Sequence, residues 1–188
     1  IHAASWDGSS IDLDIDGLPV GIYEYEIVVF DSSANAATDS LLVTVSDSTN
    51  PMLSSPSDIL YELGSTGNGI HWNASELDPN HYRILINGSI VDHVSWNGDE
   101  INHSIDGLSV GIYNFTIVAY DGSGNSDADA VFAEVVDTVA PSIDSPDDIE
   151  YVAGSTGHEI SWSVSDLGAS FYQILRDGVV FVDAAWDG

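Results

Sequence analysis

The residues with the most potential for chemistry in this 188-residue chain are its carboxylates, thirty-one Asp and Glu against two arginines and no lysine. Calcium takes several oxygen ligands, so acidic loops that meet between successive copies of an internal repeat could hold it. The alternative is that these aspartates form turns, and no EF-hand spacing supports a metal. We therefore predict no required cofactor and treat Ca²⁺ as a hypothesis. The candidate ligands are Asp16, Asp47, Asp58, Asp78 and Asp121 at one junction and Asp106, Asp137, Asp147, Asp148 and Asp166 at the next.

The six histidines give no support to catalysis. Nucleophilic catalysis needs a Ser, Cys or Thr beside a positioned base. None of the histidines recurs at the spacing of the repeat: Ser161 stands 90 residues after His71, and His103 replaces Leu13 at a position expected to face inward. No HExxH motif, phosphate-binding loop or Gly-Xaa-Ser-Xaa-Gly elbow is present. We predict that the chain is not an enzyme and has no catalytic residue.

Four asparagines lie in N-glycosylation sequons, and all four fall within residues 51–137. One sits on an expected hairpin turn, and the other three alternate with apolar neighbours and should face outward. Chance alone produces some sequons in a chain rich in Ser and Thr, so position carries more weight than number. We predict that some of these side chains carry glycans. They are Asn73, Asn87, Asn102 and Asn114.

Composition excludes several classes of protein. A formal net charge of −29 excludes nucleic-acid binding, which depends on neutralising phosphates with Lys and Arg. The chain is 44% hydrophobic with patterned apolar residues, so it is not disordered, and we expect high salt or bound cations to reduce its self-repulsion. It has no cysteine for disulfides, and no apolar run approaches the roughly 18 residues that span a membrane.

The sequence repeats itself every 90 residues. Trp6, Trp96 and Trp186 are separated by 96 − 6 = 186 − 96 = 90 residues. The segment DGLPVGIY at 16–23 returns as DGLSVGIY at 106–113, and many further positions match at the same offset. Such regular self-similarity indicates a tandem array of one structural unit.

Each unit reads as short alternating strands separated by turns, with no convincing helix. Asn87-Gly88 and Asp177-Gly178 lie between apolar runs, which is a strong hairpin signal. Seven strands in about 90 residues favour an all-β fold of tandem two-sheet sandwiches. In the middle unit we predict strands near 58–63, 69–75, 81–87, 90–95, 100–105, 112–120 and 129–136.

The late segment DGLSVGIYNFTIVAYDGSGN resembles the last strands of immunoglobulin-like and fibronectin-III-like domains, with Tyr113 and Tyr23 at the tyrosine-corner position. APSIDSPDDIEYVAGSTGHEISWSVSD is similar to bacterial and archaeal Ig-like repeats, with some likeness to hyalin repeats, although the cysteine pair of animal hyalin repeats is absent. This resemblance implies an extracellular, cell-surface setting, closest to archaeal surface proteins. It specifies a fold and a setting and no activity.

The register divides the chain unevenly. Residues 1–47 carry the C-terminal part of one repeat, 51–137 a complete repeat, and 141–188 the N-terminal part of another. A half sandwich leaves open sheet edges and an uncovered core face. Either the sequence is a stretch of a longer continuous array, which the overlap of 1–8 with 181–188 favours, or one copy completes the sandwich of the next, head to tail.

Apolar residues on the outward face of the late strands predict an interface. If Tyr113, Phe115 and Ile117 face inward, their neighbours face outward and join apolar residues of adjacent strands in one patch, which indicates packing between domains. The alternative is an error in the inward–outward phase. The predicted interface residues are Val28, Phe30, Leu42, Leu85, Val118, Tyr120, Phe132 and Leu175.

These observations predict a structural protein of an extracellular fibre, stalk or surface layer that assembles with copies of itself. One alternative is an adhesin module that recognises surface glycans or protein, with Trp6 and Trp96 as a platform for a sugar. Another is a spacer of a surface enzyme. Glycan binding would favour the adhesin, and self-assembly into filaments would favour the fibre.

Overall fold

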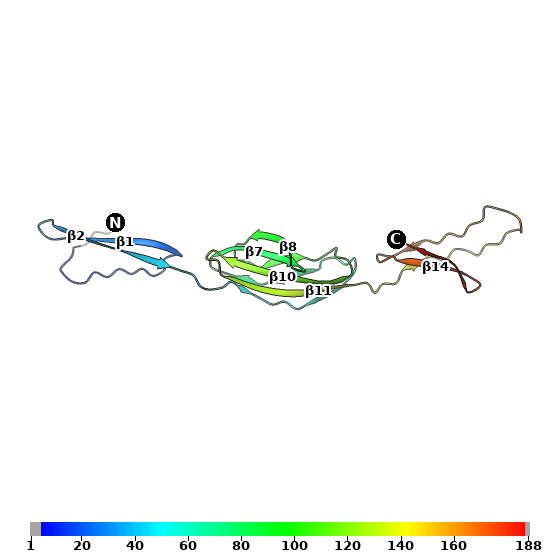
Figure 1. The fold of residues 1–188 in the computed structure, drawn as a ribbon, viewed down its shortest axis with the longest axis horizontal. Coiled ribbons are helices and arrows are strands. Elements are labelled where there is room, and N and C mark those ends of the chain that lie inside the picture. The colour runs from blue at the N-terminus through cyan, green and yellow to red at the C-terminus, as the bar shows by residue number, and fades with distance from the viewer. Residues whose placement is uncertain (1–4, 187–188) are drawn as a thin grey trace.

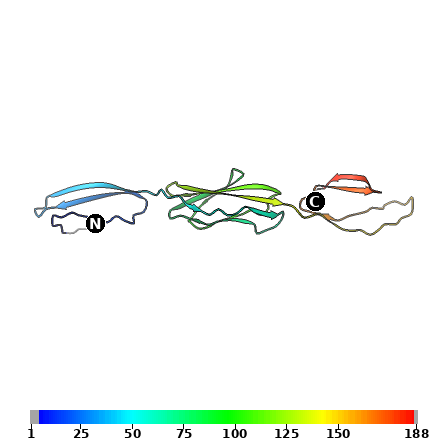
Figure 2. The ribbon, with the colours of Figure 1, turned by 90° about the horizontal axis from the view of Figure 1, so that it is seen from below.

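The structure, a computed structural model, describes residues 5–186 and is all-β. Three bodies follow one another in a line: a hairpin body at the N-terminal end, a closed sandwich in the middle and an open body at the C-terminal end (Figures 1 and 2). Within the described residues there is no helix long and apolar enough to cross a membrane.

The larger sheet of the middle body has five strands in the order β4-β11-β10-β7-β8. All neighbours are antiparallel except β4 and β11, which run parallel and pair from Ile59↔Ala133 to Glu62↔Val136. The strands are β4 (Ile59–Glu62), β7 (Pro79–Ile86), β8 (Ser89–Ser95), β10 (Gly111–Asp121) and β11 (Ser126–Val136).

A second layer covers the inner face of this sheet. It is built from two short antiparallel pairs, β3 (Met52–Leu53) with β6 (Ala74–Ser75) and β5 (Gly69–Trp72) with β9 (Ile101–Ser104). The core lies between the layers, and its largest fully buried side chains include Trp72 and Phe115. Two stacked sheets around one apolar core form a β-sandwich, as the sequence predicted.

Alternation along β10 and β11 explains why these segments form the central strands. Phe115, Ile117 and Ala119 are fully buried, and so are Val131 and Ala133 on the neighbouring strand. Successive side chains of a strand point to opposite faces, so this pattern aligns every second residue with the core. The predicted inward–outward phase is therefore confirmed.

The tight hairpins also fold as predicted. Asn87 and Gly88 both have positive φ (51° and 83°), and Asp177 and Gly178 repeat the conformation (53° and 79°). Two consecutive residues with positive φ match the twist of the flanking strands, which is why Asn-Gly and Asp-Gly are favoured there.

Besides shifts of one or two residues at strand ends, three features differ from the prediction. The segment predicted as one strand over 69–75 forms two strands, β5 and β6. β5 pairs with β9, whereas after Asn73 the chain pairs with β3. Between the two strands, Asn73 forms two hydrogen bonds with Ser54. Its carbonyl accepts the Ser54 N–H at 2.8 Å, and its N–H donates to the Ser54 hydroxyl at 2.8 Å. The last strand begins at Ser126 rather than at 129, and the two-residue strand β3 was not predicted.

The strands of the end bodies fall 90 residues from strands of the middle sandwich. β1 (Gly21–Phe30) and β2 (Ala36–Val45) correspond to β10 and β11, and their register is the same, with Tyr23↔Val43 matching Tyr113↔Ala133. At the other end, β12 and β13 correspond to β3 and β6, and β14 and β15 correspond to β7 and β8. Their bounds are Ser142–Ile143, Val164–Ser165, Phe171–Arg176 and Val179–Ala185.

Other repeated segments form no strand in the end bodies. Residues 149–152 and 159–162 correspond to β4 and β5, and residues 11–14 correspond to β9, yet all three segments are irregular. Their partners in the middle sandwich belong to the part of the repeat that each end body lacks. A segment of the repeat thus forms a strand only where its partner strand is present, because backbone N–H and C=O groups need hydrogen-bond partners.

Candidate functional site

The middle sandwich shows what a completed repeat looks like. The Trp72 indole N–H donates to the Asp129 carboxylate at 2.8 Å, and the Tyr61 hydroxyl donates to the Ile105 carbonyl. These bonds join the two layers and satisfy the polar atoms of large, otherwise apolar side chains.

The same positions lie open in the end bodies. Trp72 is 0% exposed but Trp162 is 39% exposed, and Ile70 is 1% exposed but Ile160 is 57% exposed. The exposed members of this set are Trp6, Ile11, Ile15, Ile27, Leu41, Tyr151, Ile160 and Trp162. Their buried counterparts, 90 residues away, are Trp96, Ile101, Ile105, Ile117, Val131, Tyr61, Ile70 and Trp72. Each end body therefore presents the inner face of a sandwich that it does not close.

The two open faces are complementary. Residues 141–186 hold the counterparts of β3 to β8, and residues 9–47 hold the counterparts of β9 to β11. Together they supply one full set of strands. The bodies that carry them lie on opposite sides of the middle sandwich (Figure 1), so they do not close on each other within one chain.

The repeated tryptophan marks the seam between the two halves. In the middle sandwich the Trp96 N–H donates to the Asn80 carbonyl at 2.9 Å, and its indole N–H donates to the Asp99 carbonyl at 2.7 Å. Trp186 keeps the first bond, from its N–H to the Ser170 carbonyl at 2.9 Å. Trp6 keeps the second, from its indole to the Ser9 carbonyl at 2.7 Å. Each end body therefore keeps one of the two hydrogen bonds that Trp96 makes in the middle sandwich.

Burial of Trp96 corrects one expectation. Its ring is 6% exposed and belongs to the core cluster, so it offers no face to a sugar. Trp6 is exposed because residues 5–47 contain only part of the core around it. The recurring tryptophan is a packing residue of the sandwich.

Both predicted tyrosine corners are present. The Tyr113 hydroxyl donates to the Ser109 carbonyl at 3.0 Å, and the Tyr23 hydroxyl donates to the Pro19 carbonyl at 2.9 Å. The bond ties the strand to the turn before it, so the entry to β10 and to β1 has the same geometry in both repeats.

Asp121 is the most buried of the calcium candidates, at 1% exposure. Its carboxylate accepts the Ser123 N–H at 3.0 Å, the Asn125 N–H at 2.7 Å and the Asn125 side-chain amide at 2.6 Å. Burial raises the pKa of this carboxyl, but the bonds from Asn125 and the loop outweigh burial and hold the pKa below its usual value. Its oxygens thus close a turn of the chain.

Most other calcium candidates bond backbone N–H groups nearby. Asp106 accepts the Gly67 and Asn68 N–H groups at 2.8 and 2.9 Å, and these bonds lower its pKa. The carboxylates of Asp137 and Asp166 both lie against Gly168. Within residues 5–186 no group of three or more His, Cys, Asp or Glu is arranged to hold a metal. Calcium at the junctions stays a prediction. Asp47 is half-buried in the linker after β2, and the remaining candidates, Asp16, Asp58, Asp78, Asp147 and Asp148, are exposed.

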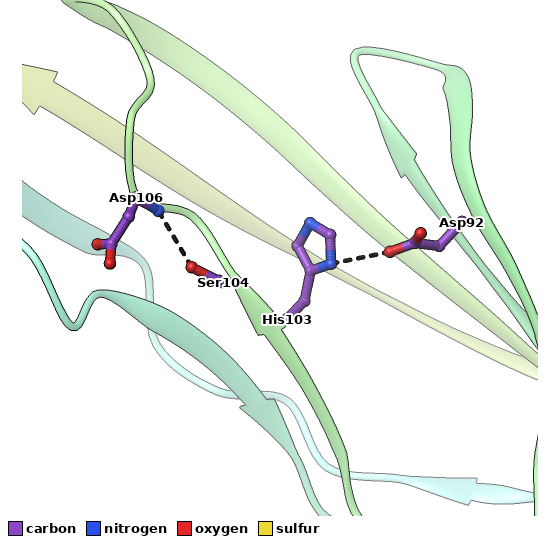
Figure 3. A network of polar contacts seen from close by, with 4 residues as sticks. All are labelled: Asp92, His103, Ser104 and Asp106. Carbon is purple, nitrogen blue, oxygen red and sulfur yellow. Dashed lines mark hydrogen bonds and ion pairs between the residues drawn. The ribbon is translucent and has the colours of Figure 1, made fainter.

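His103, the inward-facing histidine, makes a polar contact with Asp92. Its Nδ1 lies 3.1 Å from a carboxylate oxygen of Asp92 (Figure 3). Its ring centroid is 5.6 Å from that of Phe115. Beside it, the Ser104 hydroxyl accepts the Asp106 N–H at 3.4 Å. The Asp92 carboxylate thus gives the polar His103 ring a partner at the edge of the core.

Three of the sequon asparagines, Asn73, Asn87 and Asn102, are exposed, and Asn114 is half-buried. The Asn87 side-chain oxygen accepts the Asn114 N–H at 2.9 Å, which fastens the β7–β8 hairpin turn to β10. Glycosylation of these four residues stays a prediction.

The predicted apolar patch is more mixed than the sequence suggested. Phe132 is exposed, but Leu85, Val118 and Tyr120 are half-buried by neighbours on the same face. In the end bodies Val28, Phe30, Leu42 and Leu175 are all exposed.

The neighbours that cover the patch are basic and aromatic. His81 stacks on Tyr120 with ring centroids 4.6 Å apart and lies 4.7 Å from the His93 ring. The Arg83 guanidinium carbon is 5.3 Å from the centre of the Tyr120 ring. Burial, followed by the charges of His93 and Arg83, lowers the pKa of His81. Sequence reasoning missed this cluster, although alternation with Tyr82 and Ile84 places His81 and Arg83 outward.

The two junctions between bodies are built alike. A cavity of about 700 Å³ at the first includes Asp47, Met52 and Leu77 in its lining, and one of about 360 Å³ at the second includes their counterparts Asp137, Ser142 and Leu167. At the first junction the Asn125 amide donates to the Asp47 carbonyl at 3.2 Å. The links between repeats thus follow the 90-residue offset as well.

Comparison with known proteins gives limited similarity. No protein-family model matches the chain, and no curated protein does. The fibronectin(III)-like modules of Clostridium thermocellum CbhA are similar with a TM-score of 0.32 and 16% identity, over 45% of this chain and 94% of that chain. Bacteroides ovatus SGBP-B, from the mixed-linkage glucan utilization locus and in complex with a mixed-linkage heptasaccharide, is similar with a TM-score of 0.24 and 15% identity, over 89% of this chain and 53% of that chain. The sandwich assignment rests on this chain's own strand order.

Proposed function

We propose that this chain is a non-enzymatic structural segment of an extracellular fibre, stalk or surface layer, in which residues 9–47 of one copy complete the sandwich begun by residues 141–186 of another. The observation that carries this proposal is the matched set of core positions, buried in the middle sandwich and exposed at both ends. The likeness of the sequence to repeats of bacterial and archaeal surface proteins supports the extracellular setting.

The apolar surface provides the driving force. Fully burying one large apolar side chain stabilises by about 1.5–3 kcal/mol. Seven of the exposed residues, all except Trp6, lie within 9–47 and 141–186 and have buried counterparts in the middle sandwich. The gross gain on closing one sandwich is therefore on the order of 10 kcal/mol, enough to offset the entropy lost when two chains associate.

Backbone pairing adds specificity to this closure. The irregular segment 159–162 corresponds to β5, and its partner β9 corresponds to residues 11–14 of a second copy. Likewise residues 149–152 correspond to β4, which pairs with β11 in the middle sandwich and would pair with β2 of the second copy. Addition of strands to an open sheet uses main-chain hydrogen bonds for affinity and side-chain pockets for selection.

Head-to-tail closure produces a fibre. One end body of each copy offers the early strands and the other offers the late strands, so the contact is heterologous and does not close on itself. A row of copies then alternates sandwiches 51–137, made by one chain, with sandwiches shared by two chains.

An extended chain tests the closure directly. Position 188 is equivalent to position 8, since 188 − 180 = 8, so residues 9–47 appended after Gly188 continue the repeat without a break. We expect the appended strands to bury Trp162, shift its fluorescence to shorter wavelength and slow hydrogen exchange in 149–162. The matched control appends the same residues with Ile15, Ile27 and Leu41 changed to Ser. Equal exchange in both extended chains would refute the closure.

Fibre formation needs a separate measurement on the 188-residue chain itself. We expect sedimentation velocity to show concentration-dependent growth and electron microscopy to show thin filaments. The chain extended by 9–47 should lengthen less, because its own appended strands occupy the open C-terminal face. A 188-residue chain that stays monomeric at every concentration would contradict assembly in trans.

A further inference from the structure

We propose that the outward face of the five-stranded sheet, around Arg83, binds the acidic outward face of strand β1, around Glu24 and Glu26, of a second copy. This goes beyond end-to-end closure, because it joins neighbouring fibres or chains side by side. It arises from the unequal distribution of charge on faces that are equivalent in the repeat.

The first observation is that Arg83 lies over Tyr120 but has no acidic partner within the described residues. The chain has thirty-one acidic residues and two arginines, yet no carboxylate in residues 5–186 forms an ion pair with Arg83. Its Nε and the Nε2 of His81 are buried without a hydrogen-bond partner. Arg83 as a whole is only half-buried, so its charge remains within reach of a carboxylate from a second molecule.

The nearby carboxylates point to the other side of the sheet. Asp92 pairs with His103, Asp127 accepts the Leu53 N–H at 3.2 Å, and Asp129 accepts the Trp72 indole. The outward positions beside Arg83 are held instead by His93 on β8 and Val118 on β10, its direct cross-strand neighbours. The face is thus a basic and aromatic area on a strongly acidic molecule.

The equivalent face of the end bodies has the opposite character. Glu24 and Glu26 are exposed on β1 where β10 has Asn114 and Thr116. At the C-terminal end the cross-strand pair Arg83↔His93 becomes Gln173↔Asp183, and Asp183 is exposed. The middle face therefore presents a cation at Arg83, with its exposed Glu134 six residues along β11 from Ala128, and the end faces present carboxylates at positions that are close to Arg83 in the repeat.

The apolar residues on the two faces also favour contact between these faces. Val28 and Phe30 continue β1 beyond Glu26 and are exposed, and Leu85 and Tyr120 flank Arg83 on the middle face. Facing sheets would bury these side chains around the ionic contact. The opposite charges set the stagger: the middle sandwich of one copy lies against the N-terminal body of its neighbour, because two like faces would repel.

A charge exchange on the full chain tests the pairing. Arg83→Glu and Glu26→Arg should each weaken lateral association about tenfold or more, and the double variant should restore it. Lateral association is measured by the width of filament bundles, or by sedimentation of unpolymerised chains, and end-to-end closure is measured by filament length. Width should change while length does not, so failure of this proposal is distinguishable from failure of the closure.

Two further variants separate the effect from misfolding. Arg83→Gln introduces the residue found at the equivalent position 173, so the sheet should fold and association should still weaken. Arg176→Gln is the matched control and should change nothing, because Arg176 lies over Phe181 in the C-terminal body. Unchanged association in Arg83→Glu, or a double variant that does not recover, overturns the proposal. So does saturable binding of glucuronate at Arg83 without any lateral association.

Discussion

Ile70 and Ile160 provide the sharpest test of sandwich closure because they are the same residue, 90 positions apart, in different surroundings. Ile70 is 1% exposed and pairs with His103 across β5 and β9, whereas Ile160 is 57% exposed and lies in an irregular segment. Truncating a buried isoleucine to alanine costs about 2–5 kcal/mol, through lost burial and the cavity left behind. Ile70→Ala should therefore lower the free energy of unfolding of the middle sandwich by that amount.

The cost of Ile160→Ala should depend on whether the missing strands are present. In the dispersed 188-residue chain it should cost less than about 1 kcal/mol, since more than half of the side chain is already in water. In the chain extended by residues 9–47 it should cost the same 2–5 kcal/mol as Ile70→Ala, roughly 30-fold to several-thousand-fold in the equilibrium constant.

Urea unfolding followed by tryptophan fluorescence measures these costs, with hydrogen exchange of 69–72 and 159–162 to assign each transition. Once the missing strands are supplied, the two substitutions should lower the free energy of unfolding by equal amounts. If Ile160→Ala remains nearly neutral in the extended chain, residue 160 does not enter a core and the 90-residue equivalence fails at the level of packing.

Four smaller predictions follow from single contacts. Tyr113→Phe removes the bond to the Ser109 carbonyl and should cost about 0.5–1.5 kcal/mol in urea unfolding. The pKa of Asp121 lies below that of an unfolded chain, so its stabilisation is present at neutral pH and is lost as pH falls through the folded pKa; melts at pH 7 and pH 3 should show a loss that is smaller in Asp121→Asn. Asn87→Ala places a Cβ-bearing residue at positive φ and removes the acceptor of the Asn114 N–H, so it should destabilise the hairpin by about 1–2 kcal/mol, while Asn87→Gly loses only that acceptor and should cost less. If calcium binds at the junctions, EDTA should lower the melting temperature and Ca²⁺ should restore it; an identical melt with and without chelator would remove that hypothesis.

Local pattern made the middle sandwich predictable. The alternation that buries Phe115 and Ile117 and the positive φ at Asn87 and Gly88 depend on neighbours within one or two strands, so the sequence contains the signal. The break between β5 and β6 was not predictable in this way. It depends on Ser54, which is distant from Asn73 in sequence and bonds to it in space.

The positions of the open faces could be predicted from the sequence, but the contacts of individual side chains could not. The 90-residue offset identified the open faces, because it showed which strands each end lacks. The cluster of His81, His93 and Tyr120 was missed, since it requires the register between three strands. Whether a given Asp binds a metal or closes a turn is likewise decided by the local path of the backbone, as at Asp121.

The parallel pairing of β4 with β11 determines how tension passes through a sandwich. The chain enters near β4 and leaves after β11, on opposite sides of the middle body (Figure 1). Pulling the ends apart therefore slides these two strands along each other, so the hydrogen bonds between Ile59–Glu62 and Ala133–Val136 are loaded together rather than opened one at a time. In a shared sandwich the equivalent ladder, 149–152 against β2, joins two different chains. The clamp that resists extension of a single sandwich would then also be the bond that holds successive copies together.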